Sequence, residues 1–310
     1  MKIFRSIEEV KSSGIGPSAC ALGNFDGIHK GHQKLIQRSI ELAKENGIRS
    51  AVFTFSEHPI NVMSGHLMVK NILKEEDKMQ ILSDMGVDYV FSFPFSDDIR
   101  TLSPRDYAGN LLKGTLNIRF AICGFNHSFG FKAAGKNPDL IAFGKEFGFD
   151  TEVIPPVEVD GIIVSSTLIR ACIEKGDMGL YKDYTGRPYI IYGTIIQGEH
   201  NGRKMGFPTV NLNLDTSMAL PANGVYTTYS YLEDSKYKSV TNVGNKPTIG
   251  DFAKNAETHI FEFQENAYGK PLKVEFIRMQ RPEFKFENME ALANQIEKDC
   301  KEAKEYHDLH

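Results

Sequence analysis

The sequence has 310 residues, of which 41% are hydrophobic and 25% are charged, and its formal net charge is -4 at pH 7. This length is comfortable for two domains, and the composition is that of an ordinary globular protein. The acidic balance argues against non-specific nucleic-acid binding, which needs a basic surface. No window approaches the roughly 18 consecutive apolar residues of a membrane span. We therefore expect neither a nucleic acid nor a membrane as partner.

The four cysteines, Cys20, Cys123, Cys172 and Cys300, are scattered along the chain and show no zinc-ligand spacing. Cys20 and Cys123 lie in apolar runs, where a thiol behaves as a small buried hydrophobe. Reduced thiols are typical of the cytosol. The N-terminus lacks the apolar core of a signal peptide. These features predict a cytoplasmic protein.

The first half of the chain alternates strand patterns with helix patterns. Strands are expected at 18–25, 50–55, 89–93, 118–123 and 151–154, and helices at 31–46, 74–85, from Ser103 onward, and at 137–147. Gly47 is the expected stop of the helix at 31–46, and Ser103 is an expected N-cap followed by Pro104. Alternation of this kind predicts a doubly wound parallel α/β sheet.

The segment Gly23–His32 (Gly-Asn-Phe-Asp-Gly-Ile-His-Lys-Gly-His) follows the first of these strands. An apolar strand, a glycine turn and a polar helix start are typical of phosphate-binding sites in α/β proteins. His29 and His32 are three residues apart, so both can point at one phosphate. Gly23 and Gly31 allow close approach, Asn24 can hydrogen-bond, and Asp26 can cap or orient. The alternative is an Asx turn followed by a helix with two solvent histidines.

Further segments at strand ends support the same prediction, since open α/β sheets bind ligands there. In Val164–Arg170, the hydroxyls of Ser166 and Thr167 at a helix start, together with Arg170, suit a phosphate. The loop Gly124–Gly130 has glycines and aromatic rings that could clamp a ligand ring, with Asn126 reading a polar edge. The segment 55–59, which contains His58, ends another strand. Taken alone, each segment is an ordinary N-cap or turn.

The pattern changes near residue 184. Short strands separated by Gly, Pro and Asn turns are expected at 189–196, 209–214, 224–232, 238–242, 257–263 and 272–278, with a helix at 288–306. The segment 242–248 is expected to form a tight turn. Strands of this length and spacing predict a small antiparallel barrel or sandwich. Because the strand–helix alternation ends here and the short strands begin, we expect the domain boundary at about 180–187.

The densest polar segment of the second half is 198–212. Its glycines and basic residues make a loop able to wrap phosphates, although the Walker A spacing is absent; these residues are Gly202, Arg203, Lys204 and Gly206. Thr209 and Asn211 alternate on a strand, and their oxygens can hold Mg²⁺ together with nucleotide phosphates. Glu257 and His259 share one strand face, where Glu257 could act as a general base. The alternatives are a plain hairpin loop and a solvent-facing strand.

With these motifs in view, the chain closely resembles the bacterial bifunctional riboflavin kinase/FAD synthetase family along essentially its whole length. Gly23–His32 is similar to that family's adenylyltransferase signature, which belongs to the HxGH nucleotidyltransferase superfamily. Ser165–Arg170 is similar to its SSTxIR motif, and Gly206–Asn211 to its kinase motif GFPTAN, with Val210 where alanine is usual. Leu168 stands where many members carry arginine. Residues 126–128 read Asn-His-Ser where Asp-Phe-Arg is frequent.

The resemblance implies a Rossmann-like nucleotidyltransferase domain over 1–183 and an antiparallel β-barrel kinase domain with a C-terminal helix over 184–310. It implies that ATP and Mg²⁺ serve both halves, that riboflavin is phosphorylated to FMN with Glu257 as base, and that FMN is adenylylated to FAD. It implies ATP contacts from the signature, including Phe25, while His29 and His32 stabilise charge on the phosphates. Flavin contacts are expected from His58, Asn126 and Phe129.

Two other readings remain open from the sequence. One is a monofunctional enzyme in which one half is degenerate, and the other is a flavin-binding regulator without catalysis. A redox flavoenzyme is disfavoured, because no GxGxxG fingerprint follows the first strand. We expect a monomer or a weak homo-oligomer.

Overall fold

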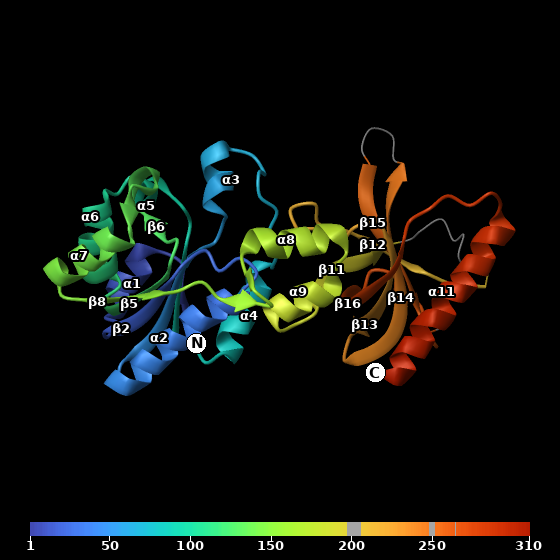
Figure 1. Cartoon of the computed structure of the whole chain (residues 1–310), viewed down its shortest axis with the longest axis horizontal. Coiled ribbons are helices and arrows are strands. Elements are labelled where there is room, and N and C mark those ends of the chain that lie inside the picture. The colour runs from blue at the N-terminus through green and yellow to red at the C-terminus, as the bar shows by residue number, and fades with distance from the viewer. Residues whose placement is uncertain (197–205, 248–251, 264) are drawn as a thin grey trace. The chain divides into compact units, whose positions relative to one another are not determined.

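The computed structural model describes residues 1–196, 206–247, 252–263 and 265–310. The chain divides into two compact units, Met1–Ser166 and Thr167–His310 (Figure 1). In the described ranges, no helix is both long enough and apolar enough to cross a membrane.

The first unit is built on a six-stranded parallel sheet with the strand order β1-β4-β3-β2-β5-β8. Its strands are β1 (Lys2–Phe4), β2 (Ser18–Leu22), β3 (Arg49–Phe55), β4 (Tyr89–Phe93), β5 (Ile118–Gly124) and β8 (Asp150–Ile154). Every residue of β2 is buried, as expected for a central strand covered on both faces. The predicted doubly wound sheet is confirmed.

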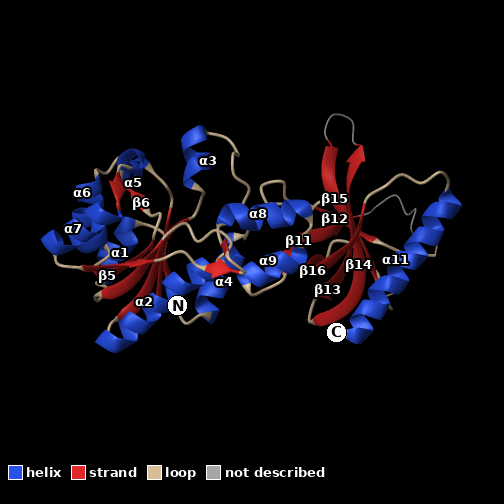
Figure 2. Cartoon of the chain, viewed as in Figure 1, coloured by secondary structure: helices blue, strands red, loops and turns tan. Residues whose placement is uncertain are grey.

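Helices cover both faces of this sheet (Figure 2). The longer ones are α1 (Ile7–Ser13), α2 (Lys30–Asn46), α4 (Glu75–Asp84), the π-helix η1 (Tyr107–Thr115) and α7 (Asn137–Phe147). Apolar residues of α2 and α4 pack on one face with Ala21 and Val52, and those of α1, η1 and α7 pack on the other with Cys20 and Phe53. Neighbouring strand residues thus point to opposite faces, which produces two cores.

The remaining elements of the first unit are short. They are α3 (Pro59–Ser64), α5 (Asp97–Arg100), α6 (Pro104–Asp106), the 3₁₀ turn η2 (Phe131–Ala133), and the strand pairs β6 (Ser128–Phe129) with β7 (Gly135–Lys136) and β9 (Glu158–Val159) with β10 (Ile162–Ile163). Two expected helix signals are confirmed: the Ser103 side chain caps α6, and Gly47 ends α2 with a φ of 62°.

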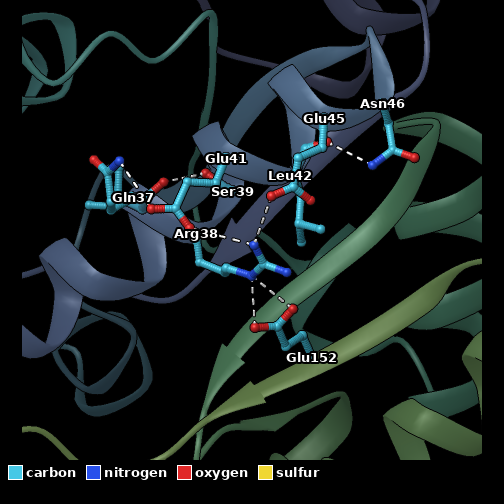
Figure 3. Close-up of polar contacts among 9 residues, drawn as sticks. Gln37, Arg38, Ser39, Glu41, Leu42, Glu45, Asn46 and Glu152 are labelled. Atoms are coloured by element: carbon cyan, nitrogen blue, oxygen red, sulfur yellow. Dashed lines mark hydrogen bonds and ion pairs between the residues drawn. The ribbon is translucent and has the colours of Figure 1, made fainter.

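An ion-pair network ties α2 to the edge strand β8 (Figure 3). The Arg38 Nε lies 2.9 and 3.0 Å from the two carboxylate oxygens of Glu152, and its Nη1 lies 3.4 Å from Glu45. The Glu152 hydrogen bond raises the pKa of Arg38 above its ordinary value. The network links the middle of α2 to the edge strand β8.

The second unit is a closed six-stranded antiparallel barrel with strand order β11-β12-β15-β14-β13-β16, so the predicted barrel is confirmed. Its elements are α8 (Ser166–Lys175, which starts at the unit boundary), α9 (Met178–Thr185), β11 (Tyr189–Ile196), β12 (Val210–Asn213), β13 (Gly224–Leu232), β14 (Ser235–Pro247), β15 (Phe252–Ile260), β16 (Pro271–Pro282) and α11 (Met289–Leu309).

Helix α11 packs on the outer surface of this barrel (Figure 1). Val225 and Val240 form an apolar cluster with Cys300 and Ala303 of the helix. The expected turn at 242–248 is wrong for its described part, because residues 242–247 continue β14 and pair with β15, and residues 242 and 243 also pair with β13. The side-chain alternation of a long barrel strand overrides the local Asn and Gly turn signal there.

Candidate functional site

The strand order fixes where a ligand site can form in the first unit. The chain runs from β2 through β3 to β4 on one side, and then crosses to β5 and β8 on the other side of β2. The carboxyl ends of β2 and β5 therefore flank a topological switch point, where open α/β sheets bind ligands. Gly23 follows β2 directly, and the Gly124–Gly130 loop begins at the end of β5. The segment before α8 differs from expectation, because it follows the small β9–β10 ribbon rather than a strand of the main sheet.

The loop from Gly23 to Ile28 is held by its carbonyl groups. The Thr54 hydroxyl donates to the carbonyl of Asn24 (2.9 Å), the Ser166 hydroxyl donates to that of Asp26 (2.9 Å), and the Gln33 amide donates to that of Ile28 (2.9 Å). Three donors from different elements thus fix the path of the loop. The sequence prediction included Ser166 in this site, and within the first unit its hydroxyl does bond the loop.

Backbone strain marks the same loop. Phe25 and Ile28 adopt φ values of 49° and 35°, in the left-handed region that side chains other than glycine avoid. Such strain costs on the order of 1–3 kcal/mol per residue and persists only where the surroundings impose it. Both side chains are fully buried beside α2. Burial of these two side chains offsets the strain and holds the loop in one conformation.

His29 and His32 stand at the N-terminus of α2. His29 is the N-cap residue and 6% exposed, and its Nδ1 accepts a hydrogen bond from the backbone N–H of His32 (3.3 Å). The two rings stack with centroids 3.7 Å apart, and the Phe25 ring meets the His32 ring edge-on at 5.2 Å. The expectation that both histidines point the same way is confirmed. Since Nδ1 of His29 accepts, the proton of its ring is on Nε2, whose N–H is a donor.

The glycines of the segment make room for the protein's own side chains. A Cβ on Gly31 would lie 3.0 Å from Cε1 of the His29 ring, and a Cβ on Gly23 would lie 3.3 Å from the Phe25 ring. Gly27 has a φ of 82° and faces Ile72. Gly31 is thus required for the position of the His29 ring, a reason that the sequence pattern alone did not reveal.

Asp26 acts within the protein. It is 9% exposed, and its Oδ1 accepts a hydrogen bond from the backbone N–H of Ile72 (3.0 Å). The carboxylate thus caps the backbone at Ile72, whereas the ATP contact expected of Asp26 stays a prediction. Lys78 on α4 was not expected at this site; it is 8% exposed, and the charge of Asp26 favours its charged form. Thr167 and Arg170, also expected at this site, lie in the first two turns of α8 and belong to the second unit.

The residues expected to bind flavin lie in three environments. His58 is the N-cap of α3, where its Nδ1 accepts from the backbone N–H of Ile60 (3.3 Å). Asn126 is exposed on the loop after β5. Phe129 is 5% exposed and packs in the core, with its ring centroid 5.2 Å from that of Tyr107. The exposed aromatic ring of this loop is Phe125, at 48%.

A polar face of the barrel carries the candidate residues of the second half. Asn211 of β12 pairs in register with Glu257 of β15, and the Asn255 amide donates to Oδ1 of Asn211 (3.0 Å). Asn211 and Asn255 are 4% and 9% exposed. Alternation on β15 puts Asn255, Glu257 and His259 on one face, as expected for the last two. Asn255 is an addition that the sequence patterns did not single out.

His259 closes one end of this face. Its Nδ1 lies 2.7 Å from the Pro208 carbonyl, and its ring meets the Phe207 ring edge-on at 5.9 Å. Burial lowers the pKa of His259 below its ordinary value. This contact ties the segment before β12, which includes Thr209, to the strand that carries Glu257. Gly206 has a φ of 86°, whereas Gly202, Arg203 and Lys204 lie outside the described residues.

Among the described residues, no group of three or more His, Cys, Asp or Glu side chains could hold a metal ion. All four cysteines are free and buried, which confirms the expectation for Cys20 and Cys123. The two polar arrangements suit chemistry on phosphate by the groups that they present. The first offers a helix N-terminus with two imidazoles, and the second offers amide oxygens beside a carboxylate.

Comparison with known proteins identifies two families along the chain. Residues 12–168 match the family of FAD synthetases, and residues 185–307 match that of riboflavin kinases. The bifunctional riboflavin kinase/FMN adenylyltransferase of Bacillus subtilis is 32% identical over 307 residues, which cover 93% of this chain and 92% of that protein. The protein of the same name from Listeria monocytogenes is 32% identical over 281 residues, covering 90% and 89%.

A crystal structure described as a macrolide-efflux protein from Streptococcus pneumoniae has a TM-score of 0.87 at 26% identity, over 97% of this chain and 98% of that one. The two folds therefore agree along the whole length. The resemblance that the motifs predicted is confirmed by the matches to both halves and by the full-length relatives. The chain belongs to the family of bifunctional riboflavin kinase/FMN adenylyltransferases.

Proposed function

We propose that this chain makes FMN from riboflavin and then FAD from FMN, using ATP in both steps. The part over 184–310 transfers the γ-phosphoryl group of ATP to the riboflavin 5′-hydroxyl. The part over 1–183 joins the AMP portion of ATP to FMN. The observation that carries the proposal is the stacked pair His29 and His32 at the N-terminus of α2, in a chain that matches both families.

In the adenylyl transfer, a phosphate oxygen of FMN attacks the α-phosphorus of ATP, and the bond to pyrophosphate breaks. Such a step depends on positioning and on neutralising negative charge. The Nε2–H of His29 would donate to a phosphate oxygen, with His32 beside it and the helix N-terminus adding a favourable dipole. The other proposed ATP ligands are Gly23, Asn24, Phe25, Asp26, Gly31, Ser166, Thr167 and Arg170.

In the kinase step, Glu257 would take the proton of the riboflavin 5′-hydroxyl as its oxygen attacks the γ-phosphorus. The register of β12 and β15 supports this role, because it sets Asn211 beside Glu257. The proposed phosphate ligands of this half are Gly202, Arg203, Lys204, Gly206, Thr209 and Asn211. The flavin contacts proposed for the adenylyl transfer are His58, Asn126 and Phe129.

Mg²⁺ fits the donor atoms of Thr209 and Asn211. A hydroxyl and an amide oxygen are hard ligands, and Mg²⁺ bound with nucleotide phosphates needs few protein ligands. An amide oxygen carries two lone pairs, and the Asn255 amide donates to Oδ1 of Asn211 (3.0 Å). The ion would offset the charge of the phosphates when bound. Asn255 would keep the Asn211 amide turned with its oxygen toward that charge.

We further propose a cytoplasmic enzyme that acts as a monomer or a weak homo-oligomer. The free, buried thiols support the location, since reduced cysteines are typical of the cytosol.

The experiment that tests the function supplies the purified chain with ATP and Mg²⁺, and with either riboflavin or FMN. Chromatography identifies the products. We expect riboflavin to give FMN and then FAD, and FMN alone to give FAD. If riboflavin gave only FMN, and supplied FMN gave no FAD, the adenylyl transfer would be rejected and a monofunctional kinase would remain. Tight flavin binding with no ATP turnover would instead indicate a regulator.

A further inference from the structure

Lys78 is a buried lysine that the proposed chemistry does not use. It lies on α4 and is 8% exposed, and its Nζ donates a hydrogen bond to the carbonyl of Phe55 (3.3 Å). Phe55 is the last residue of β3, and the chain continues from it to His58. A lysine ammonium is strongly hydrated, so burial is costly unless partners compensate. Nearby groups must therefore stabilise the Lys78 ammonium if it is charged in the folded protein.

Two carboxylates near Lys78 provide this stabilisation. Burial lowers the pKa of Lys78 below the ordinary lysine value; the carboxylates of Asp26 and Glu75 oppose this shift, and the Arg5 guanidinium adds to it. Glu75 is itself held by the Ser92 hydroxyl (2.9 Å) and by Arg5. Asp26 belongs to the strained loop that leads into His29, and it also bonds Ile72. Lys78 is thus hydrogen-bonded to the end of β3, and its charge is attracted by a carboxylate of the loop after β2.

We propose that Lys78 is a positioning residue of the adenylyltransferase site. Its ammonium holds the end of β3 by a hydrogen bond to the Phe55 carbonyl, and its charge attracts the Asp26 carboxylate in the loop after β2. This fixes the spacing between the histidine pair on α2 and the segment at His58. The proposal rests on the proposed function, because it assigns the positioning to FMN adenylylation.

A role in stability alone makes a different prediction. Removing one partner of a buried charge cluster leaves the other charges unpaired and is destabilising. A lysine kept for the fold alone would therefore lower the stability of the first unit when it becomes methionine, but FAD formation by the folded protein would keep its alkaline pH profile when it becomes arginine. Misplacement of reacting groups by about 1 Å, by contrast, can slow a reaction about a hundredfold.

The test uses the full chain with three substitutions. Lys78→Met removes the charge and keeps the length, and Lys78→Arg keeps a charge that can still donate to the Phe55 carbonyl. Lys113→Met is the matched control, because the Lys113 Nζ also donates to a backbone carbonyl, that of Gly148 (2.8 Å). Gly148 precedes β8, an edge strand that two other strands, β2 and β5, separate from β3. FAD formation from FMN and FMN formation from riboflavin are measured for each variant.

We expect Lys78→Met to lower kcat/KM for FMN adenylylation by about tenfold or more, with riboflavin phosphorylation within about twofold of wild type. Lys78→Arg should recover most of the loss, and Lys113→Met should change neither activity. Adenylylation by Lys78→Met at the wild-type rate would overturn the proposal, as would an equal loss of both activities. A wild-type chain that makes no FAD would instead reject the proposed function itself.

A pH profile keeps the proposal testable where Lys78→Met does not fold. In the wild type, adenylylation should fall on the alkaline side as Lys78 loses its proton below the ordinary lysine range. In Lys78→Arg the guanidinium stays charged, so this fall should move to higher pH while the phosphorylation profile stays the same. Identical alkaline profiles for adenylylation in the two proteins would overturn the proposal.

Discussion

His29 and Glu257 separate the two activities at the scale of single residues. His29→Ala removes the proposed donor to the ATP phosphates and the N-cap of α2, so we expect FAD formation to fall by about 10²-fold or more. Riboflavin phosphorylation should remain nearly intact.

Glu257→Gln removes the proposed general base of the kinase step. It should lower riboflavin phosphorylation by about 10²–10⁴-fold and leave FAD formation from FMN nearly intact. Both rates are read from purified variants with riboflavin or FMN as substrate; loss of both activities from either change would contradict the separation.

His127 predicts how the first unit responds to acid. Burial, with the Lys136 ammonium adding to it, lowers the pKa of His127 to about 4. Among the described residues its Nε2 has no hydrogen-bond partner, and its ring stacks on Phe129. The unfolded chain takes up this proton near pH 6.5 and the folded chain only near pH 4, so stability is lost as pH falls through that window. The full effect is about 3 kcal/mol.

The test compares wild type with His127→Phe, which keeps an aromatic ring at 127 and removes the titrating group. Urea unfolding of the first unit is followed by circular dichroism at about pH 7 and about pH 5. The wild type should lose more stability than the variant on acidification. Equal losses would show that the proton uptake occurs elsewhere.

The ends of some helices and strands could be predicted from the residues at those positions, whereas other ends depend on contacts that are distant in sequence. The α2 helix begins and ends within one residue of expectation, because a polar N-cap and Gly47 mark its ends. The strand expected at 18–25 stops at Leu22, since the chain turns into the strained loop whose shape depends on buried side chains far along the sequence.

The site was predictable in part for the same reason. The pairing of His29 with His32 follows from spacing along one helix. Lys78 and Asn255 were not predicted, because their partners are more than 40 residues away in sequence. Lys78 is attracted by Asp26, and Asn255 donates to Asn211. Residues 242–247 were misassigned because their turn-forming residues are held in β14 by pairing with β15, which lies close to them only in the folded barrel.

Helix α11 should depend on one buried ion pair. Asp299 is 4% exposed and accepts hydrogen bonds from Nε (3.0 Å) and Nη2 (2.7 Å) of Arg281 on β16, and from the Gln295 amide (2.8 Å). Removing one partner of a buried pair costs about 3–5 kcal/mol. Asp299→Asn should destabilise the second unit by about that amount in urea unfolding.

The matched control is Glu302→Gln on the same helix. Glu302 pairs with Arg278 (3.0 Å), but both side chains are about 40% exposed. An exposed pair contributes about 1 kcal/mol or less. Similar losses in the two variants would mean that the buried pair is not what anchors α11.

At the scale of the whole molecule, the two proposed activities form a sequence, because the FMN made by one half is the substrate of the other. The structural division falls between Ser166 and Thr167, whereas the kinase family match begins at residue 185. The helices α8 and α9 lie between these two positions. The packing of these helices determines whether a fragment without them would fold into a stable kinase.

Both helices belong to the core of the second unit. Ile173 and Cys172 of α8 are buried, the Ile173 carbonyl accepts a hydrogen bond from the Ala222 N–H (3.2 Å), and Tyr181 of α9 packs edge-on against Tyr189 of the barrel at 5.2 Å. At the turn between them, a Cβ on Gly176 would lie 2.6 Å from the Met279 side chain. This is the packing of a single core rather than of a linker.

A fragment of residues 167–310 should therefore fold and phosphorylate riboflavin, whereas one of residues 184–310 should be largely unfolded. The shorter fragment loses several large buried side chains, each contributing about 1.5–3 kcal/mol, and their sum exceeds the usual stability margin of a small domain. Thermal unfolding by circular dichroism and the riboflavin phosphorylation rate compare the two fragments. If they were equally stable and equally active, α8 and α9 would be dispensable to the barrel, and the boundary expected near 184 would also be the physical one.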